Sequence, residues 1–199
     1  MTIATYLLFV LGCLGAADII LFHAIAQSIR RHYESRQELI VHSLRGPTYA
    51  ALFVLVPNCV MQGAFFWMLV GLLAFDLAIS LWDFSIERRS RRSVGGVPTG
   101  EYVLHVVMGI VFGGVIAAVF FEGLPWASAP TRLAFVPAPV PWVLRCIITL
   151  MALPVLMSGV RDLHAALRLG RSAKVLLPTG TPTDTLHAVR PRGDSEHEP

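Results

Sequence analysis

The segment GAFFWMLVGLLAFDLAISLWDFSIERRSRR, residues 63–92, decides the fold class. It is apolar over almost its whole length, interrupted by Asp76 and Asp83, and it ends in a run of arginines that starts at Arg88. A helix rises about 1.5 Å per residue, so about 20 apolar residues cross the hydrocarbon core of a bilayer. Residues 63–87 are therefore predicted to form a transmembrane helix.

Similar apolar runs lie on both sides of this segment. The chain is 55% hydrophobic and 15% charged, whereas about a quarter of the residues in a soluble domain are charged. Its net charge of +3 comes from arginines beside the ends of the runs, which indicates membrane topology and not nucleic-acid binding. We predict an all-α membrane protein with five transmembrane helices, at residues 3–29, 37–56, 63–87, 101–121 and 142–167.

The basic segments set the expected orientation. With five spans, the arginines after residue 29, in 88–100 and after residue 167 all fall on one side of the membrane. The positive-inside rule then places the N-terminus outside and the C-terminus in the cytoplasm. We expect an integral domain over 1–170 in a bacterial inner (plasma) membrane. Residues 171–199, rich in Pro, Thr and charge, are expected to form a disordered cytoplasmic tail.

A repeated pattern relates the first four spans. When the arginine pairs at 30–31 and 88–89 are aligned, Asp18 falls over Asp76. Each following span then opens with Glu-x-x-x-His-x-x-x-Gly, as Glu38, His42, Gly46 and as Glu101, His105, Gly109. The repeat predicts a bundle of two repeated hairpins related by an approximate two-fold axis along the membrane normal, with a fifth helix alongside.

Helical spacing gathers the ionisable residues into stripes, because positions i, i+4, i+7 and i+11 share a face. One stripe runs from Glu38 through Arg45 to Tyr49, and another from Asp76 to Glu87. A charge at the centre of a membrane helix costs about 2.5 to 3.5 kcal/mol on insertion scales. These side chains are therefore expected to face the bundle interior, where an ionisable group marks a candidate functional site.

The sharpest hypothesis is a metal centre in the cytoplasmic half of the bundle. A Glu and a His four residues apart can converge on one ion, and two such pairs would supply two ions of a dinuclear centre, with Asp83 and Glu87 as further or bridging carboxylates. Mixed carboxylate and imidazole ligands favour iron or manganese, and a lipid or quinone-like molecule would then be the natural substrate of a membrane oxidoreductase. The candidate ligands are Glu38, His42, Asp83, Glu87, Glu101, His105 and His23.

Three other hypotheses remain open. His42 and His105 occupy matching positions and could be the axial ligands of a b-type haem. Chains of acids and histidines also carry protons or ions in transporters, and the deeper Asp18 and Asp76 fit that role better. In a purely structural interpretation, Arg45 neutralises Asp76 or Asp18, and the loop arginines pair with the glutamates. No motif in the chain names a reaction.

Overall fold

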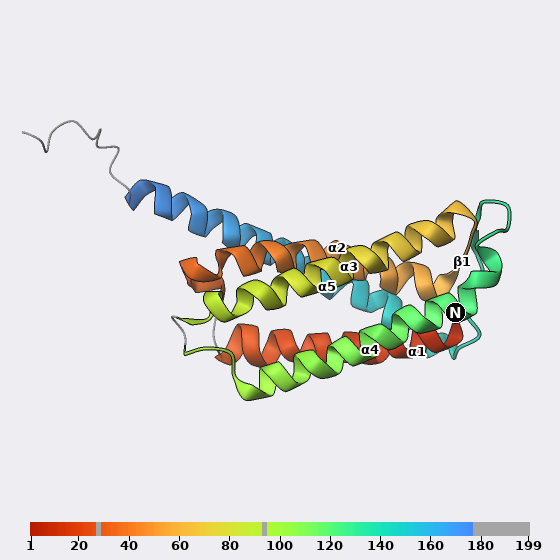
Figure 1. Ribbon diagram of the computed structural model, residues 1–199, viewed down its shortest axis with the longest axis horizontal. Helices are drawn as coiled ribbons and strands as arrows, with labels where there is room; N and C mark the ends of the chain where they lie inside the picture. The colour runs from red at the N-terminus through yellow and green to blue at the C-terminus, as the bar shows by residue number, and fades with distance from the viewer. Residues whose placement is uncertain (27–28, 93–94, 177–199) are drawn as a thin grey trace, which may run out of the picture.

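The structure, a computed structural model, describes residues 1–26, 29–92 and 95–176. Within these ranges the chain forms five helices that are long and apolar enough to cross a membrane (Figure 1). The prediction of an all-α membrane protein is confirmed. The five helices are α1 (Thr2–Asp18), α2 (Arg36–Asn58), α3 (Ala64–Ser90), α4 (Thr99–Gly123) and α5 (Trp142–Leu176).

The first and last helices differ most from the predicted spans. The regular α-helix of α1 ends at Asp18, and a π-helix, η1 (Ile19–Ala26), continues the first span. Helix α5 continues past the predicted end at residue 167 as far as Leu176. The rest of the predicted tail, 177–199, lies outside the described residues.

Short elements connect the helices. At one end of the bundle, strand β1 (Cys59–Gln62) pairs antiparallel with β2 (Arg132–Phe135). The sequence analysis expected only a turn and a Pro-rich connection there, so this two-stranded sheet was missed. At the other end are the 3-10 helices η2 (Ile29–Arg31) and η3 (Tyr33–Ser35), while η5 (Leu124–Trp126) follows α4.

Helix packing does not follow chain order. Helix α1 packs mainly on α4, and α2 packs on both α5 and α3, whereas the consecutive pairs α1–α2 and α3–α4 make few contacts. Exchanging the two hairpins of the repeat turns the α1–α4 contact into the α3–α2 contact, as an approximate two-fold axis requires. The α2–α5 contact is close because Gly46 faces Gly159: a Cβ on Gly46 would lie 2.9 Å from the Cα of Gly159.

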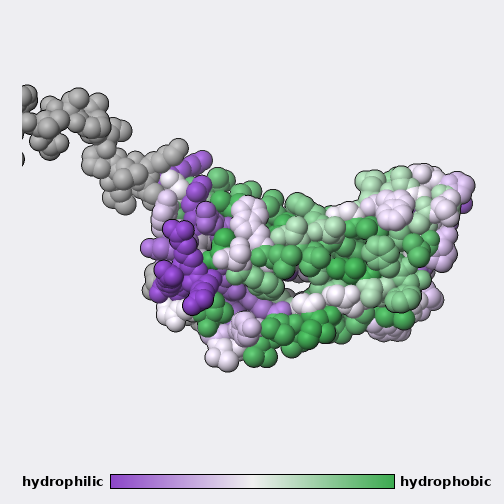
Figure 2. Space-filling view, in the orientation of Figure 1, coloured by the Kyte–Doolittle hydropathy of each residue, from purple (hydrophilic) through white to green (hydrophobic). Residues whose placement is uncertain are grey.

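The two ends of the bundle have different surfaces. The N-terminus lies at the end that carries the β1–β2 sheet, and the last turns of α5 extend from the opposite end (Figure 1). Hydrophilic residues gather at that opposite end, and a broad apolar band covers the middle (Figure 2). We call it the basic end, after Arg30, Arg36, Arg88, Arg89 and Arg168. Exposed apolar side chains such as Ile110 and Leu150 suit helices surrounded by hydrocarbon.

Candidate metal centre

Among the residues that the structure describes, the buried charges occupy the half of the bundle nearer the basic end. In the other half, α1 to α4 pack a large apolar core that includes Leu8, Leu52, Phe66 and Val115. Between this core and the basic end, α1 to α4 bury six carboxylates, all less than 9% exposed. They belong to Asp18, Glu38, Asp76, Asp83, Glu87 and Glu101. The polar interior therefore extends from the basic end to about the middle of the bundle and meets apolar packing there.

Arg91 joins three of these carboxylates. Its guanidinium is completely buried and donates to both carboxylate oxygens of Glu38, with Nε 3.0 Å from each. Its Nη2 donates to Glu101 Oε1 at 3.0 Å and lies 4.0 Å from Glu87 Oε1. Because these acids come from α2, α4 and α3, one side chain ties three helices together at the basic end.

Arg91 is the residue that sequence reasoning missed. It follows α3 directly and is surrounded in the sequence by Arg88, Arg89 and Arg92, which are exposed. From the sequence, all four arginines are interpreted as part of a basic loop. Burial by itself lowers the pKa of Arg91, but the carboxylates of Glu38, Glu101 and Glu87 raise it by more. The net shift of the pKa is therefore upward, and the guanidinium stays charged. The expectation that loop arginines pair with the glutamates is confirmed.

The α2–α3 side holds a second group of ion pairs. His42 Nε2 lies 3.0 Å from Asp83 Oδ2. The guanidinium of Arg45 lies 3.6 Å from Asp76 Oδ1 and 3.7 Å from Asp83 Oδ2. Arg45 Nη2 is also 3.4 Å from the hydroxyl of Tyr49. The expected neutralisation of Asp76 by Arg45 is therefore confirmed, and the positive charge in this group is a fixed side chain.

On the α1–α4 side, His105 is placed between two carboxylates. Its Nε2 lies 3.4 Å from Asp18 Oδ2, and its Nδ1 lies 3.5 Å from Glu87 Oε2. The ring of Phe84 packs beside the imidazole, with the ring centroids 5.5 Å apart. Both ring nitrogens of His105 thus face acids, which come from two different helices, α1 and α3.

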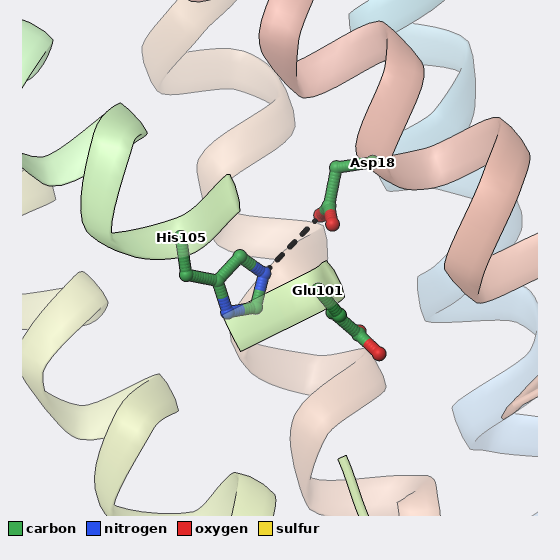
Figure 3. Close-up of side chains that lie close together, drawn as sticks. All are labelled: Asp18, Glu101 and His105. Carbon is green, nitrogen blue, oxygen red and sulfur yellow. Dashed lines mark hydrogen bonds and ion pairs between the residues drawn. The ribbon is translucent and has the colours of Figure 1, made fainter. Parts of the chain in front are cut away.

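Asp18, Glu101 and His105 form a group with the composition of a metal site. One ligand atom from each lies within 4.8 Å of the other two, and all three residues are buried. Figure 3 shows the Asp18 carboxylate and the His105 imidazole directed toward one another, while the Glu101 carboxylate turns away from the imidazole. Ligands about 2.1 Å from a common ion are at most about 4.2 Å apart. Three ligands spaced evenly around the ion would be about 3.6 Å apart or less, so holding an ion would require these side chains to close by up to about 1 Å.

The predicted ligands do not all lie in one group. Glu101 and His105 belong to the three-residue group, and Glu87 contacts the Nδ1 atom of His105, on the other side of the ring from Asp18. Glu38 is bound by Arg91 and Ser90, and His42 and Asp83 pair with each other. The side chain of His23 lies outside the described residues.

Asp18 was not among the predicted ligands, although its alignment with Asp76 had marked it. On an ideal α-helix of 100° per residue, the sequence estimate is that Asp18 points about 140° away from His23. The described chain becomes a π-helix directly after Asp18, and a π-helix turns less per residue, so this estimate does not hold. Single π-turns often accompany functional sites.

Comparisons of this chain with protein-family models, with curated proteins and with solved structures find no match. The fold and the buried charges define an integral α-helical membrane protein with an acid and histidine cluster in its interior.

Proposed function

We propose that this protein is a membrane oxidoreductase that holds one iron or manganese ion on Asp18, Glu101 and His105. The observation that carries the proposal is the convergence of these three side chains within 4.8 Å in the buried interior. Two carboxylates and one imidazole are a donor set that favours iron or manganese over copper. Three protein ligands also leave coordination positions for a substrate, as catalytic sites require.

Glu87 supports the assignment of His105 as a ligand. A histidine that binds a metal through one nitrogen commonly donates its other N–H to a carboxylate, which fixes the orientation of the ring. Here Nε2 faces Asp18 and Nδ1 faces Glu87 at 3.5 Å. The imidazole is therefore oriented toward the three-residue group by an acid from another helix.

One ion fits the arrangement better than two. The second pair of the repeat, Glu38 and His42, would have to supply the other ion. Glu38 receives several hydrogen bonds from the buried Arg91, and His42 contacts Asp83. These contacts satisfy the second pair with side chains, so the dinuclear form of the metal hypothesis receives less support than a mononuclear one.

The surroundings of the group favour a lipid or quinone-like substrate. The cluster lies within helices that the bilayer surrounds, and a polar substrate would have to enter past the Arg91 ion pairs. When bound, iron or manganese would supply the redox chemistry, and the carboxylates would hold it in place. Under the positive-inside rule the basic end faces the cytoplasm, so the substrate would come from the inner leaflet.

The haem hypothesis receives less support from the contacts. Haem ligation needs only the two imidazoles and leaves the buried acids beside them without a role. These acids are Asp83, 3.0 Å from His42 Nε2, and Asp18, 3.4 Å from His105 Nε2. Transport is favoured by a different observation: the buried acids extend along the bundle from Glu38 to Asp76, which is the arrangement of an ion pathway that reaches halfway across the membrane.

The test is the metal content and visible spectrum of the protein, purified in mild detergent without chelators or a histidine tag. We expect one iron or manganese per chain and no Soret band. His105→Ala should lose the ion, because it removes a ligand and the group that Glu87 orients. His42→Ala is the matched control: it changes the equivalent histidine of the repeat and should keep the ion.

The other outcomes identify the competing hypotheses. A Soret band lost in both histidine variants would replace the metal centre with haem. Folded wild-type protein without metal or haem would contradict the proposal and leave transport or a structural role. Transport would then be measured as flux into vesicles, which Asp76→Asn should abolish if the acids form an ion pathway.

A further inference from the structure

We propose that the substrate reaches the metal centre sideways from the hydrocarbon of the bilayer, between α3 and α4, and that Phe84 gates this entrance. The inference rests on the proposed function, because it concerns access to Asp18, Glu101 and His105. It commits to a slender, hydrocarbon-soluble molecule with a metal-coordinating polar group. It excludes a water-soluble substrate entering from the basic end.

The first observation is the loose contact between α3 and α4. These helices follow one another in the chain, yet they make far fewer contacts than α1 with α4 or α2 with α3. Aromatic contacts bridge them near each end of the shared length. Phe66 packs on Phe120 with centroids 6.2 Å apart, and Phe84 packs on His105. Figure 2 shows an opening in the middle of this face of the bundle, between its upper and lower helices.

The second observation is the free space at Gly109, one helical turn beyond His105 on α4. Positions i and i+4 share a helix face, so Gly109 lies beside the imidazole along the helix. A Cβ at this position would meet no atom within 4 Å. Its equivalent in the repeat, Gly46, is instead filled by the backbone of α5. Gly109 is exposed, so the glycine of the second hairpin leaves open space on the outer surface of α4, one turn from a candidate ligand.

The third observation is the position of Phe84 between the ligand and the bilayer. Phe84 is 43% exposed, whereas His105 is 8% exposed. The two rings are in contact, so one phenyl ring covers the imidazole on the lipid side. A phenylalanine side chain turns about two bonds, and a rotation away from His105 would open the entrance without moving a helix.

The kind of molecule follows from what surrounds the entrance. The nearby exposed side chains of α4 are apolar, with Val106 47% and Ile110 71% exposed. The route from the basic end passes Arg91, which is completely buried among three carboxylates. A molecule already dissolved in the bilayer avoids that barrier, whereas a charged molecule would need to break it.

The protein is loaded with Mn²⁺ and placed in lipid vesicles. The experiment then measures how fast chelators remove the bound ion. Two chelators are compared: an alkylated 8-hydroxyquinoline, which partitions into the bilayer, and EDTA, which stays in water. Phe84→Ala should make removal by the lipid-soluble chelator several-fold faster and leave removal by EDTA unchanged. Gly109→Leu should fill the free space and make removal by the lipid-soluble chelator slower.

Gly71→Leu is the matched control for Gly109→Leu. Gly71 lies on α3 and also has free space around it, but it has no contact with the cluster, so its removal rates should equal those of the wild type. Equal acceleration of both chelators by Phe84→Ala would overturn the gate, because it would indicate general loosening. If Gly109→Leu and Gly71→Leu change the rate of removal by the lipid-soluble chelator equally, the proposed route is overturned. Wild-type protein that binds no Mn²⁺ would instead overturn the proposed function, and the route would fall with it.

Discussion

The approximate two-fold axis of the repeat relates the α2–α3 side of the bundle to the α1–α4 side. These two halves place the same residue types around different centres. In the α2–α3 half, Arg45 lies between Asp76 and Asp83, within 3.7 Å of each. In the α1–α4 half, the position equivalent to Arg45 is Met108, which is 8% exposed and carries no charge. The equivalent residues are Glu38, His42, Arg45 and Asp76 in the first half and Glu101, His105, Met108 and Asp18 in the second.

This difference indicates how each half balances its buried acids. A carboxylate in a medium of low dielectric constant needs a positive partner. In the α2–α3 half a covalently attached guanidinium provides it. The α1–α4 half keeps the acid and the histidine but has a thioether at the place of the guanidinium, and there the ligand atoms converge. Arg91 pairs with Glu101 in the second half, so the contrast concerns the equivalent positions of Arg45 and Met108: we interpret the first as holding a fixed cation and the second as leaving room for an exchangeable one beside Asp18.

The largest expected effect follows from giving the second half a fixed cation. Met108→Arg should abolish metal binding, because the guanidinium would pair with Asp18 and occupy the place of the ion. The measurement is elemental analysis of protein that elutes as a folded species from size exclusion. Met108→Leu, which keeps the volume and adds no charge, should retain the ion. Full metal content in Met108→Arg would contradict the comparison.

The reciprocal change should create a second site. Arg45→Met leaves Asp76, Asp83 and His42 without the guanidinium, so a metal ion becomes the available partner and the metal content should double. The variant should also be less stable than the wild type without metal and recover when metal is added. Arg45→Lys keeps a positive charge and should hold the wild-type amount. A variant that is folded, stable and no richer in metal would show that Arg45 does not stand in for an ion.

The sequence predicted the transmembrane helices, because their apolar composition follows from the hydrocarbon that surrounds them. Apolar runs of bilayer length predicted the five helices. The repeated Glu and His positions marked Glu38 and Glu101, which both accept hydrogen bonds from Arg91. Hydropathy and spacing are local properties, so they can be read from one chain.

The parts that were missed depend on contacts between distant segments. Arg91 looks like its exposed neighbours in the sequence, and only the approach of α2 and α4 distinguishes it. The β1–β2 pairing joins segments separated by the whole of α3 and α4. The π-helix after Asp18 changes the angle between that side chain and the residues that follow it, and the apolar pattern does not reveal this change. These features require the assembled bundle.

A smaller effect is expected from the acid behind each histidine. Glu87 contacts His105 at 3.5 Å, and Asp83 contacts His42 at 3.0 Å. Glu87→Gln should weaken metal affinity by about 10- to 100-fold, as is usual for the carboxylate partner of a histidine ligand. Asp83→Asn should leave the affinity unchanged, because His42 is not a ligand. Titration of apo-protein with Mn²⁺ measures both, and equal losses would indicate that the two histidines share one ion.

The smallest effects are expected at the two glycines of the repeat, where the halves differ in packing alone. A Cβ on Gly46 would lie 2.9 Å from the Cα of Gly159 and 3.2 Å from the carbonyl oxygen of Val155. Both are backbone atoms that cannot turn aside, so Gly46→Ala should separate α2 from α5 and destabilise the protein by about 1–3 kcal/mol.

Gly109→Ala should have the opposite sign. A Cβ there would contact nothing within 4 Å, and alanine removes the conformational entropy cost of a glycine within a helix. The expected gain is about 0.5–1 kcal/mol. Unfolding of both variants in mixed detergent micelles measures the difference. Because the two glycines have the same place in the repeat and the same flanking Glu and His, opposite signs would show that α5 covers only the first half. Equal signs would mean that the second hairpin is also packed against a helix at Gly109, which would close the entrance proposed beside His105.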